Sequence, residues 1–151
     1  MLLTNQGFAV RRAELADAAA IHLLLAENSL PTKDLSGGLL THFLVATDEK
    51  GLAGVIGAEV YGEHALLRSL CTRSDLRQRG IGSALLKGLL QELLSKGVHR
   101  IFLLTENAEG FFARHGFSRT ERKSVPAEIA ATEQFRLLCP ASAVCMAGVI
   151  P

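Results

Sequence analysis

One short run near the middle of the chain, called the glycine turn below, has the residue types and spacing that bind a phosphate group. It reads Arg77, Gln78, Arg79, Gly80, Ile81, Gly82 and Ser83. A strand pattern over residues 65–72 precedes it, and a helix pattern over residues 84–96 follows it. Glycine lets a backbone approach a bulky ligand, and the first amides of a helix lack partners and carry partial positive charge. The glycine turn therefore predicts a pyrophosphate site; taken alone, it is also explained as a tight turn with solvated arginines.

The neighbouring elements must hold this turn in place. Apolar residues at helical spacing predict a helix over residues 14–27, and leucines at the same spacing fill the helix over residues 84–96, with Gly97 as its cap. Alternating or apolar runs predict strands over residues 8–12, 42–47, 52–61, 65–72 and 100–105. Beyond them we expect a loop or short helix over residues 125–132, then a terminal strand near residues 134–138 that resumes at Ala143.

Composition sets limits on the class of protein. The chain has 151 residues, 48% of them hydrophobic, and a formal net charge of +1. These values predict one packed domain over residues 1–151, and they give no reason to expect nucleic acid as a partner. No apolar stretch is long enough to span a bilayer. The N-terminus lacks a signal-peptide pattern and the three cysteines form no C-x-x-C pair, so we expect a cytoplasmic protein with reduced thiols.

Motifs on both sides of the glycine turn extend the pattern. Leu67, Leu70 and Thr72 lie just before it, and Phe111-Phe112 and Gly116-Phe117 follow one strand and one helix later. In this order and spacing the chain resembles the GNAT N-acetyltransferase family, whose acetyl-CoA motif is R/Q-x-x-G-x-G/A. The resemblance implies an α/β (α+β) fold, with a mostly antiparallel mixed central sheet, helices on both faces and a splayed parallel strand pair. It also implies acetyl-CoA as co-substrate and no metal.

The resemblance assigns cofactor roles to several positions. The glycine turn would hold the pyrophosphate. The backbone amides that would bond the thioester carbonyl and the pantetheine arm belong to Leu70, Cys71 and Thr72. Thr105 stands where an asparagine often bonds the cofactor arm, and its hydroxyl would partly substitute. Phe112 stands where a tyrosine often protonates the leaving thiolate; its ring can pack against the cofactor but has no O–H to donate.

The proton for the thiolate would then come from water, from His115 or Ser69, or from the substrate amine. A base is also needed, because a free amine is largely protonated near neutral pH. Where family members often carry a glutamate, this chain has Leu66, so Glu59 is the choice, with Glu63, His64 and a water chain as alternatives. If Glu59 faces outward instead of into a cleft, it is a solvated strand residue.

Three residues are candidates for binding the acceptor: Asn28, Arg68 and Ser69. Asn28 follows the first predicted helix, and an ordinary role as a cap or turn residue is the alternative. The planar fork of Arg68 suits a carboxylate, and a surface position is the alternative.

Two narrower resemblances concern the acceptor. The segment from Val125 to Met146, together with Leu30-Pro31-Thr32, looks like a GNAT branch associated with arsenic resistance. Leu104-Thr105 and the double phenylalanine also resemble short bacterial N-acetylglutamate synthases. Both imply a small acceptor with an α-amino acid group. Trivalent arsenic binds three thiolates, but the cysteines are as well explained as buried, inert thiols.

Other functions stay open at this point. A non-catalytic acyl-CoA sensor would account for the absent tyrosine and the unassigned base. Acetylation of peptide N-termini would require an open groove. The terminal strand could pair across a homodimer, as edge strands in this family often do.

Overall fold

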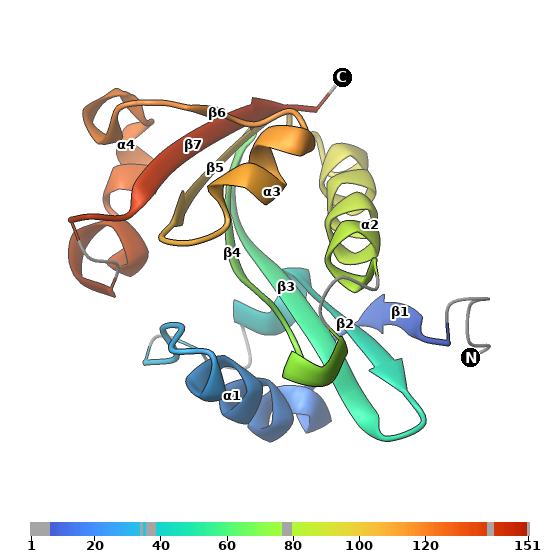
Figure 1. The fold of residues 1–151 in the computed structure, drawn as a ribbon. Helices are drawn as coiled ribbons and strands as arrows, with labels where there is room; N and C mark the ends of the chain where they lie inside the picture. Colours follow the sequence, from blue (N-terminus) through green and yellow to red (C-terminus); the bar gives the residue numbers. More distant parts are fainter. Residues whose placement is uncertain (1–6, 34, 36–38, 77–79, 139–140, 151) are drawn as a thin grey trace. The chain divides into compact units, whose positions relative to one another are not determined.

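The computed structural model describes residues 7–33, 35, 39–76, 80–138 and 141–150. Over these residues it contains one sheet with the strand order β1-β2-β3-β4-β5-β7-β6 (Figure 1). The strands are β1 (Ala9–Arg12), β2 (Phe43–Asp48), β3 (Gly51–Tyr61), β4 (His64–Thr72), β5 (Arg100–Thr105), β6 (Ser118–Arg119) and β7 (Val144–Val149). The α-helices are α1 (Ala18–Glu27), α2 (Ile81–Ser95), α3 (Glu109–Arg114) and α4 (Ala127–Ala130).

The sheet is mixed and mostly antiparallel. β1 with β2, β2 with β3, β5 with β7 and β6 with β7 are antiparallel pairs, whereas β4 and β5 are parallel. The parallel register joins His64, Ala65 and Leu66 to Arg100, Ile101 and Phe102. This arrangement confirms the fold class expected from the sequence.

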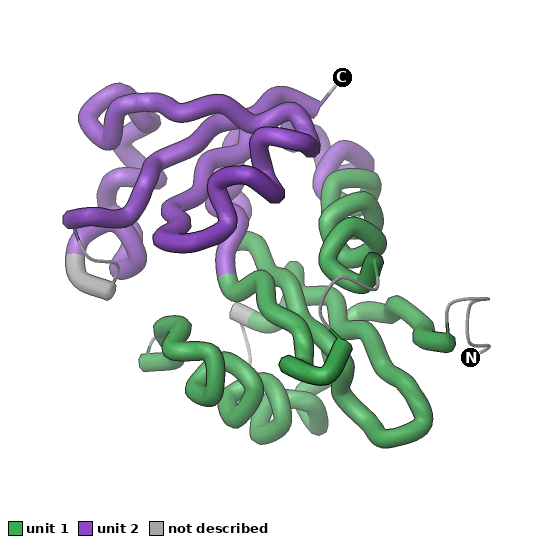
Figure 2. The backbone as a smooth tube through the Cα atoms, in the orientation of Figure 1, with its two compact units in different colours: residues 1–58, 69–92 green, residues 59–68, 93–151 purple. Residues whose placement is uncertain are grey.

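The chain forms two compact units, which Figure 2 shows in different colours. Unit 1 comprises residues 1–58 and 69–92, and unit 2 comprises residues 59–68 and 93–151. β3, β4 and α2 each contribute residues to both units.

In unit 1, helices cover both faces of the strands. Ile21, Leu24 and Leu25 of α1 form a buried cluster with alternate strand residues Phe43, Val45 and Val55. On the other face, α2 lies over Leu44, which is so close to Gly88 that a Cβ at that glycine would be 3.2 Å from the leucine Cδ1. Because successive strand residues face opposite sides of the sheet, one strand packs against both helices.

Unit 2 has its own apolar core. Leu66 of β4, Phe102 of β5 and Cys145 of β7 pack with Val125 and Ile129 from the α4 region. The buried residues of β5 lie in a continuous apolar run, as expected for a strand covered on both faces.

Three helices end in the same way, with a residue of positive φ after the last turn. In α2, Gly97 has a φ of 84°, and the amide of Val98 donates to the Leu93 carbonyl oxygen at 3.0 Å. The sequence prediction of a cap at Gly97 is therefore confirmed. α3 ends similarly at Gly116, with a φ of 93°. α1 uses Ser29, with a φ of 58°, and the amide of Leu30 donates to the Leu25 carbonyl oxygen.

Ser29→Gly is expected to stabilise the protein by about 0.5–1 kcal/mol, because a side chain is unfavourable in the left-handed conformation that this cap requires. Urea unfolding of the two proteins measures the difference. Ser95→Gly, within the last turn of α2, is the control and should destabilise by about 0.5 kcal/mol. Equal or lower stability of Ser29→Gly would contradict the prediction.

The terminal segment corrects one expectation. Residues Gln134–Leu138 form a turn of π-helix, and the last strand is Val144–Val149. The hydroxyl of Thr132 accepts a hydrogen bond from the Phe135 amide at 3.3 Å, which starts a helical turn where the sequence pattern indicated a strand. β7 is also not an edge strand, because β6 pairs with its Met146 and Ala147. Pairing across a homodimer stays a prediction.

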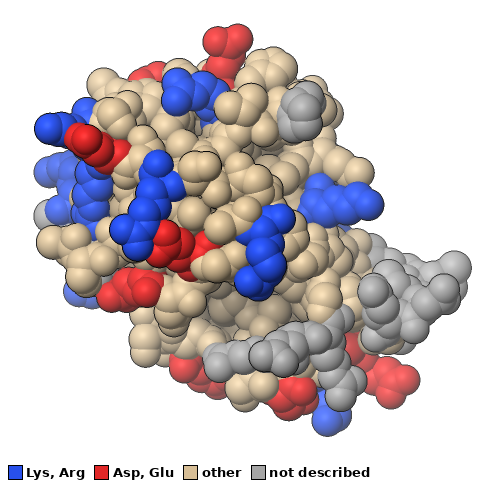
Figure 3. Space-filling view, turned by 45° about the horizontal axis from the view of Figure 1, so that its top comes forward, with Lys and Arg blue, Asp and Glu red and all other residues tan. Residues whose placement is uncertain are grey.

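The surface carries charges of both signs. On the face that Figure 3 shows, basic and acidic side chains lie among one another. Among the described residues, no helix is both long enough and apolar enough to cross a membrane.

Candidate active site

The described part of the glycine turn begins α2. Gly80 has a φ of 83°, and its carbonyl oxygen accepts the amide of Ala84 at 3.0 Å, which closes the first helical turn. Arg77, Gln78 and Arg79 lie outside the described residues. Ile81 and Leu85 are buried against β3 at Gly54, where a Cβ would be 3.0 Å from the Ile81 Cγ2 and 3.1 Å from the Leu85 Cδ1. The absence of a side chain at Gly54 thus lets the start of α2 pack directly on the strand.

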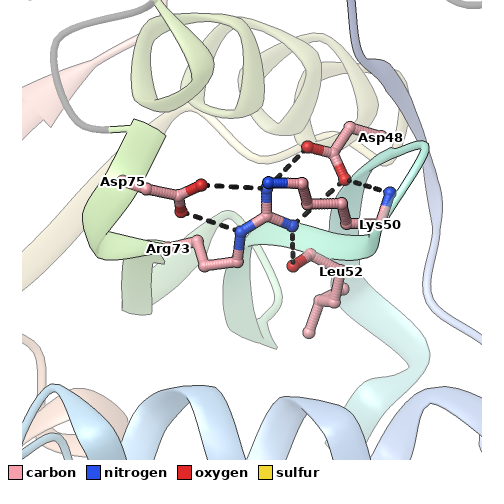
Figure 4. Close-up of polar contacts among 5 residues, drawn as sticks. All are labelled: Asp48, Lys50, Leu52, Arg73 and Asp75. Carbon is pink, nitrogen blue, oxygen red and sulfur yellow. Dashed lines mark hydrogen bonds and ion pairs between the residues drawn. The ribbon is translucent and has the colours of Figure 1, made fainter.

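The segment that leads into the glycine turn is held by Arg73 (Figure 4). Its guanidinium binds Asp48 through Nη2–Oδ2 at 2.6 Å and Asp75 through Nε–Oδ1 at 2.9 Å. It also donates to the carbonyl oxygen of Leu52 at 3.3 Å. We call this group of four residues the Arg73 clamp.

The Arg73 clamp has clear electrostatic effects on its carboxylates. Hydrogen bonding by Arg73 lowers the pKa of Asp48 below its usual range, and the amide of Lys50 adds to this effect. The same guanidinium lowers the pKa of Asp75. Both carboxylates therefore stay ionised at neutral pH, as an ion-paired cluster requires.

A second polar group lies in unit 2, on β3 and β4. Arg68 Nη1 donates to Glu59 Oε2 at 2.8 Å, and the Tyr61 hydroxyl donates to Glu59 Oε1 at 2.6 Å. The Arg68 side chain is 0% exposed and that of Glu59 is 11% exposed. The alternatives of a surface position for Arg68 and a solvated position for Glu59 are therefore wrong, because the two residues neutralise each other away from water.

Ser69 follows Arg68 directly and has an unusual backbone. Its φ is 63°, a left-handed conformation that is rare for a non-glycine residue and rarer still within a strand. It is the first residue of β4 that belongs to unit 1, and Leu70, Cys71 and Thr72 follow it there. A left-handed residue within a strand disturbs its regular geometry locally, as a bulge does.

The predicted cofactor residues of unit 2 are Thr105 and Phe112. The Thr105 hydroxyl accepts a hydrogen bond from the Ala108 amide at 3.0 Å, so its oxygen helps to start α3. Phe112 is buried, and its ring packs edge-on against Phe111 and Phe117. Contact of either side chain with a cofactor stays a prediction.

Two other candidates have structural partners. Asn28 Nδ2 donates to the Leu24 carbonyl oxygen at 2.8 Å, so the cap role of Asn28 at the end of α1 is present. The Nδ1 atom of His115 lies 2.8 Å from the Phe111 carbonyl oxygen, which requires a proton on Nδ1. This hydrogen bond commits Nδ1 of His115 to the backbone of α3.

The cysteines lie in different places. Cys71 packs at the edge of the α1 cluster in unit 1, while Cys145 is buried in the core of unit 2, and burial raises the pKa of its thiol. Cys139 lies outside the described residues. Among the side chains that the structure describes, no three His, Cys, Asp or Glu residues gather into a metal-binding group.

Sequence reasoning missed Arg73 and Tyr61. Asp48 and Arg73 are far apart in the chain, so nothing local links them. Glu59, Tyr61 and Arg68 lie on the two strands of one hairpin. The opposite charges of Glu59 and Arg68, on either side of a short turn, could have indicated that these two residues pair.

Comparison with known proteins places this fold in a family. The acetyltransferase (GNAT) domain model matches residues 40–119. An uncharacterized N-acetyltransferase of Chlorobaculum tepidum is 32% identical over 127 residues, which cover 80% of this chain and 81% of that protein. The amino-acid acetyltransferase of Mycobacterium tuberculosis is 32% identical over 129 residues, or 80% of this chain and 74% of that protein.

Solved structures agree with these matches. Rv2747 of Mycobacterium tuberculosis, in complex with CoA, has a TM-score of 0.76 and 26% identity, with coverage of 95% of this chain and 99% of that one. N-acetylglutamate synthase of Neisseria gonorrhoeae, complexed with coenzyme A and N-acetyl-glutamate, has a TM-score of 0.82 at 16% identity. The match covers 95% of this chain but only 35% of that longer chain.

The chain belongs to the GNAT family of acetyltransferases. It is an acetyl-CoA-dependent N-acetyltransferase, and the coenzyme A in the related structures is consistent with acetyl-CoA as its co-substrate.

Proposed function

We propose that this enzyme transfers the acetyl group of acetyl-CoA to the α-amino group of a small, amino-acid-like acceptor. The observation that carries the proposal is the match to an amino-acid acetyltransferase at 32% identity over four fifths of this chain. The fold likeness to an N-acetylglutamate synthase supports the same acceptor class. The arsenic resemblance receives no support from the relatives reported above, so an arsenic-related acceptor stays a prediction.

The proposed reaction is a direct transfer. The neutral amine attacks the thioester carbonyl carbon, a C–N bond forms, and the carbonyl electron pair moves onto oxygen. Collapse of this intermediate restores the carbonyl and breaks the C–S bond, which releases the CoA thiolate. The amine loses one proton and the thiolate gains one. Holding both reactants in the reactive orientation lowers the activation free energy by up to roughly 10 kcal/mol.

In this proposal the backbone amides of Leu70, Cys71 and Thr72 face the thioester and the pantetheine arm. The left-handed Ser69 supports this role, because the strand departs from regular geometry directly before these three residues. The glycine turn holds the pyrophosphate at the start of α2.

The proposal keeps all the sources that the sequence left open for the proton of the thiolate. Phe112 is buried and has no O–H, so the thiolate takes its proton from water, the amine, Ser69 or His115. Glu59 is engaged by Arg68 and Tyr61, and it serves as a base only through the remaining lone pairs of its oxygens. An acceptor carboxylate at Arg68 would have to share the guanidinium with Glu59.

The test is thiol release from acetyl-CoA, measured with free amino acids, amino-acid-like arsenicals and short peptides as acceptors. Release with one class of free amino acid, together with an N-acetylated product in mass spectra, supports the proposal. Release only with peptides would overturn it in favour of N-terminal acetylation. Glu59→Gln then separates roles, since loss of a base lowers kcat with little change in the KM for the acceptor, whereas loss of a positioning partner for Arg68 also raises that KM.

Gly80→Ala is expected to raise the KM for acetyl-CoA about fivefold with little change in kcat. The left-handed conformation at Gly80 costs roughly 1–2 kcal/mol for a residue with a side chain, and the strain falls on the proposed pyrophosphate site. Steady-state kinetics at varied acetyl-CoA measures this effect. Gly62→Ala has the same kind of strain at a φ of 63° in the β3–β4 turn and serves as the control; an equal rise of KM in both variants would contradict the prediction.

A further inference from the structure

Both ends of the glycine turn are attached to the same short stretch of β3. Before the turn, the Arg73 amide donates to the Ala53 carbonyl oxygen at 2.8 Å. Within the described part of the turn, Ile81 packs tightly on Gly54, where a Cβ would be 3.0 Å from the Ile81 Cγ2. All of these residues belong to unit 1. Residues 52–54 therefore form a common base for the two ends of the proposed pyrophosphate site.

The Arg73 side chain fastens the first of these ends. Its guanidinium joins Asp48, the last residue of β2, to Asp75 in the 3-10 helix Ser74–Leu76 (Figure 4). The Leu76 amide donates back to the Arg73 carbonyl oxygen at 2.9 Å and closes that short helix. The Arg73 clamp thus ties the entry of the glycine turn to the β2–β3 hairpin.

Arg73 differs in one respect from an arginine that binds phosphate directly. A guanidinium has five N–H donors. Arg73 makes five hydrogen bonds, two to Asp48, two to Asp75 and one to the Leu52 carbonyl oxygen, at distances from 2.6 to 3.5 Å. Its donors are therefore occupied within the protein, and its charge is balanced by two carboxylates.

An arginine used in this way acts on its neighbours and not on a ligand. A segment that is free to move must be ordered when a ligand binds, and the affinity falls by the fraction of time that it spends out of place. Anchoring both ends of a short turn removes much of that cost in advance.

We propose that Arg73 is a positioning residue for acetyl-CoA: the Arg73 clamp holds residues 73–76, which lead into the glycine turn, and thereby favours binding of the pyrophosphate. The inference rests on the proposed role of the glycine turn. It assigns to Arg73 a part in cofactor affinity without contact to the cofactor.

The experiment compares Arg73→Gln with the unaltered protein in binding two ligands. CoA carries the pyrophosphate, and pantetheine lacks it. Titration calorimetry gives the Kd for CoA, and chemical-shift titration gives the weaker Kd for pantetheine. Arg73→Gln is expected to weaken CoA about tenfold and to leave pantetheine within twofold. Arg73→Lys, which keeps the charge but loses the planar fork, should fall between the two proteins.

Arg12→Gln is the matched control. Arg12 also forms an ion pair within unit 1, to Glu92 of α2 at 2.8 Å, and it pairs with Leu44 at the opposite end of β2 from Asp48. It should leave both dissociation constants unchanged. If Arg73→Gln does not fold, Asp75→Asn, on the exposed side of the Arg73 clamp, takes its place in the same two titrations, with a smaller expected loss of CoA affinity.

The outcomes distinguish the role of Arg73 from the role of the glycine turn. Unchanged CoA binding in Arg73→Gln, or equal weakening of CoA and pantetheine, overturns the role of Arg73 and leaves the proposed pyrophosphate site intact. If the unaltered protein itself binds pantetheine as tightly as CoA, the glycine turn does not hold the pyrophosphate, and both proposals fail.

Discussion

Glu59→Leu is expected to lower the free energy of unfolding by about 3 kcal/mol or more. The guanidinium of Arg68 is buried completely, and the substitution removes the carboxylate that lies 2.8 Å from it. Removing one member of a buried ion pair typically costs 3–5 kcal/mol, because the remaining charge stays out of water. Urea unfolding at neutral pH measures the loss.

Two further variants test the cause of this loss. The double variant Glu59→Leu/Arg68→Met removes both charges, and it should recover most of the stability, as hydrophobic replacement of a buried pair often does. Glu109→Gln breaks the exposed Glu109–Arg119 pair and is the matched control; it should leave the free energy of unfolding nearly unchanged. If the double variant were no more stable than Glu59→Leu, buried charge would not be the cause.

Gly57→Ala is expected to destabilise the protein by about 3 kcal/mol through a steric clash. Gly57 lies opposite Phe43 in the β2–β3 register, and a Cβ at this position would be well under 3.0 Å from three carbons of the phenyl ring. Phe43 is fully buried in the core shared with α1, so the ring has no room to move away. Thermal and urea unfolding would detect the loss.

The identity of the clashing group is tested with Phe43→Leu. This change makes room for the new methyl group, so the double variant Gly57→Ala/Phe43→Leu should be at least about 1 kcal/mol more stable than the sum of the single effects predicts. Gly110→Ala is the control, because its Cβ would be 3.5 Å from the nearest atom outside the helix backbone; it should be neutral or stabilising. Additive effects at positions 57 and 43 would contradict the explanation.

Local patterns in the sequence predicted much of the fold. The leucines of α2 recur every three or four residues, and the glycine that ends the helix follows them directly, so this element needs no distant information. The segment Gln134–Leu138 was predicted as a strand because its helical turn depends on the Thr132 hydroxyl, whose effect on the backbone is not visible in a hydrophobic pattern.

Local sequence patterns predicted less of the candidate site, because several of its contacts join residues that are far apart in the chain. Asp48 and Arg73 meet only because the β2–β3 turn brings one end of the hairpin close to the end of β4, and residue order alone does not give that contact. Glu59 and Arg68 were both selected from the sequence, but as separate residues with separate roles. Their pairing depends on which side chains of each strand are buried, and in β4 four successive residues, Ala65 to Arg68, are buried, so alternation did not indicate it.

The hydrogen bond between Tyr61 and Glu59 gives the protein an optical reporter. The chain has no tryptophan and Tyr61 is its one tyrosine, so its ultraviolet emission comes from a single ring. That ring carries its hydroxyl 2.6 Å from a carboxylate oxygen, and a carboxylate that accepts the phenolic proton quenches tyrosine fluorescence. The tyrosine emission of the unlabelled protein therefore reports whether the hydrogen bond between Tyr61 and Glu59 is intact, in every variant that keeps Tyr61.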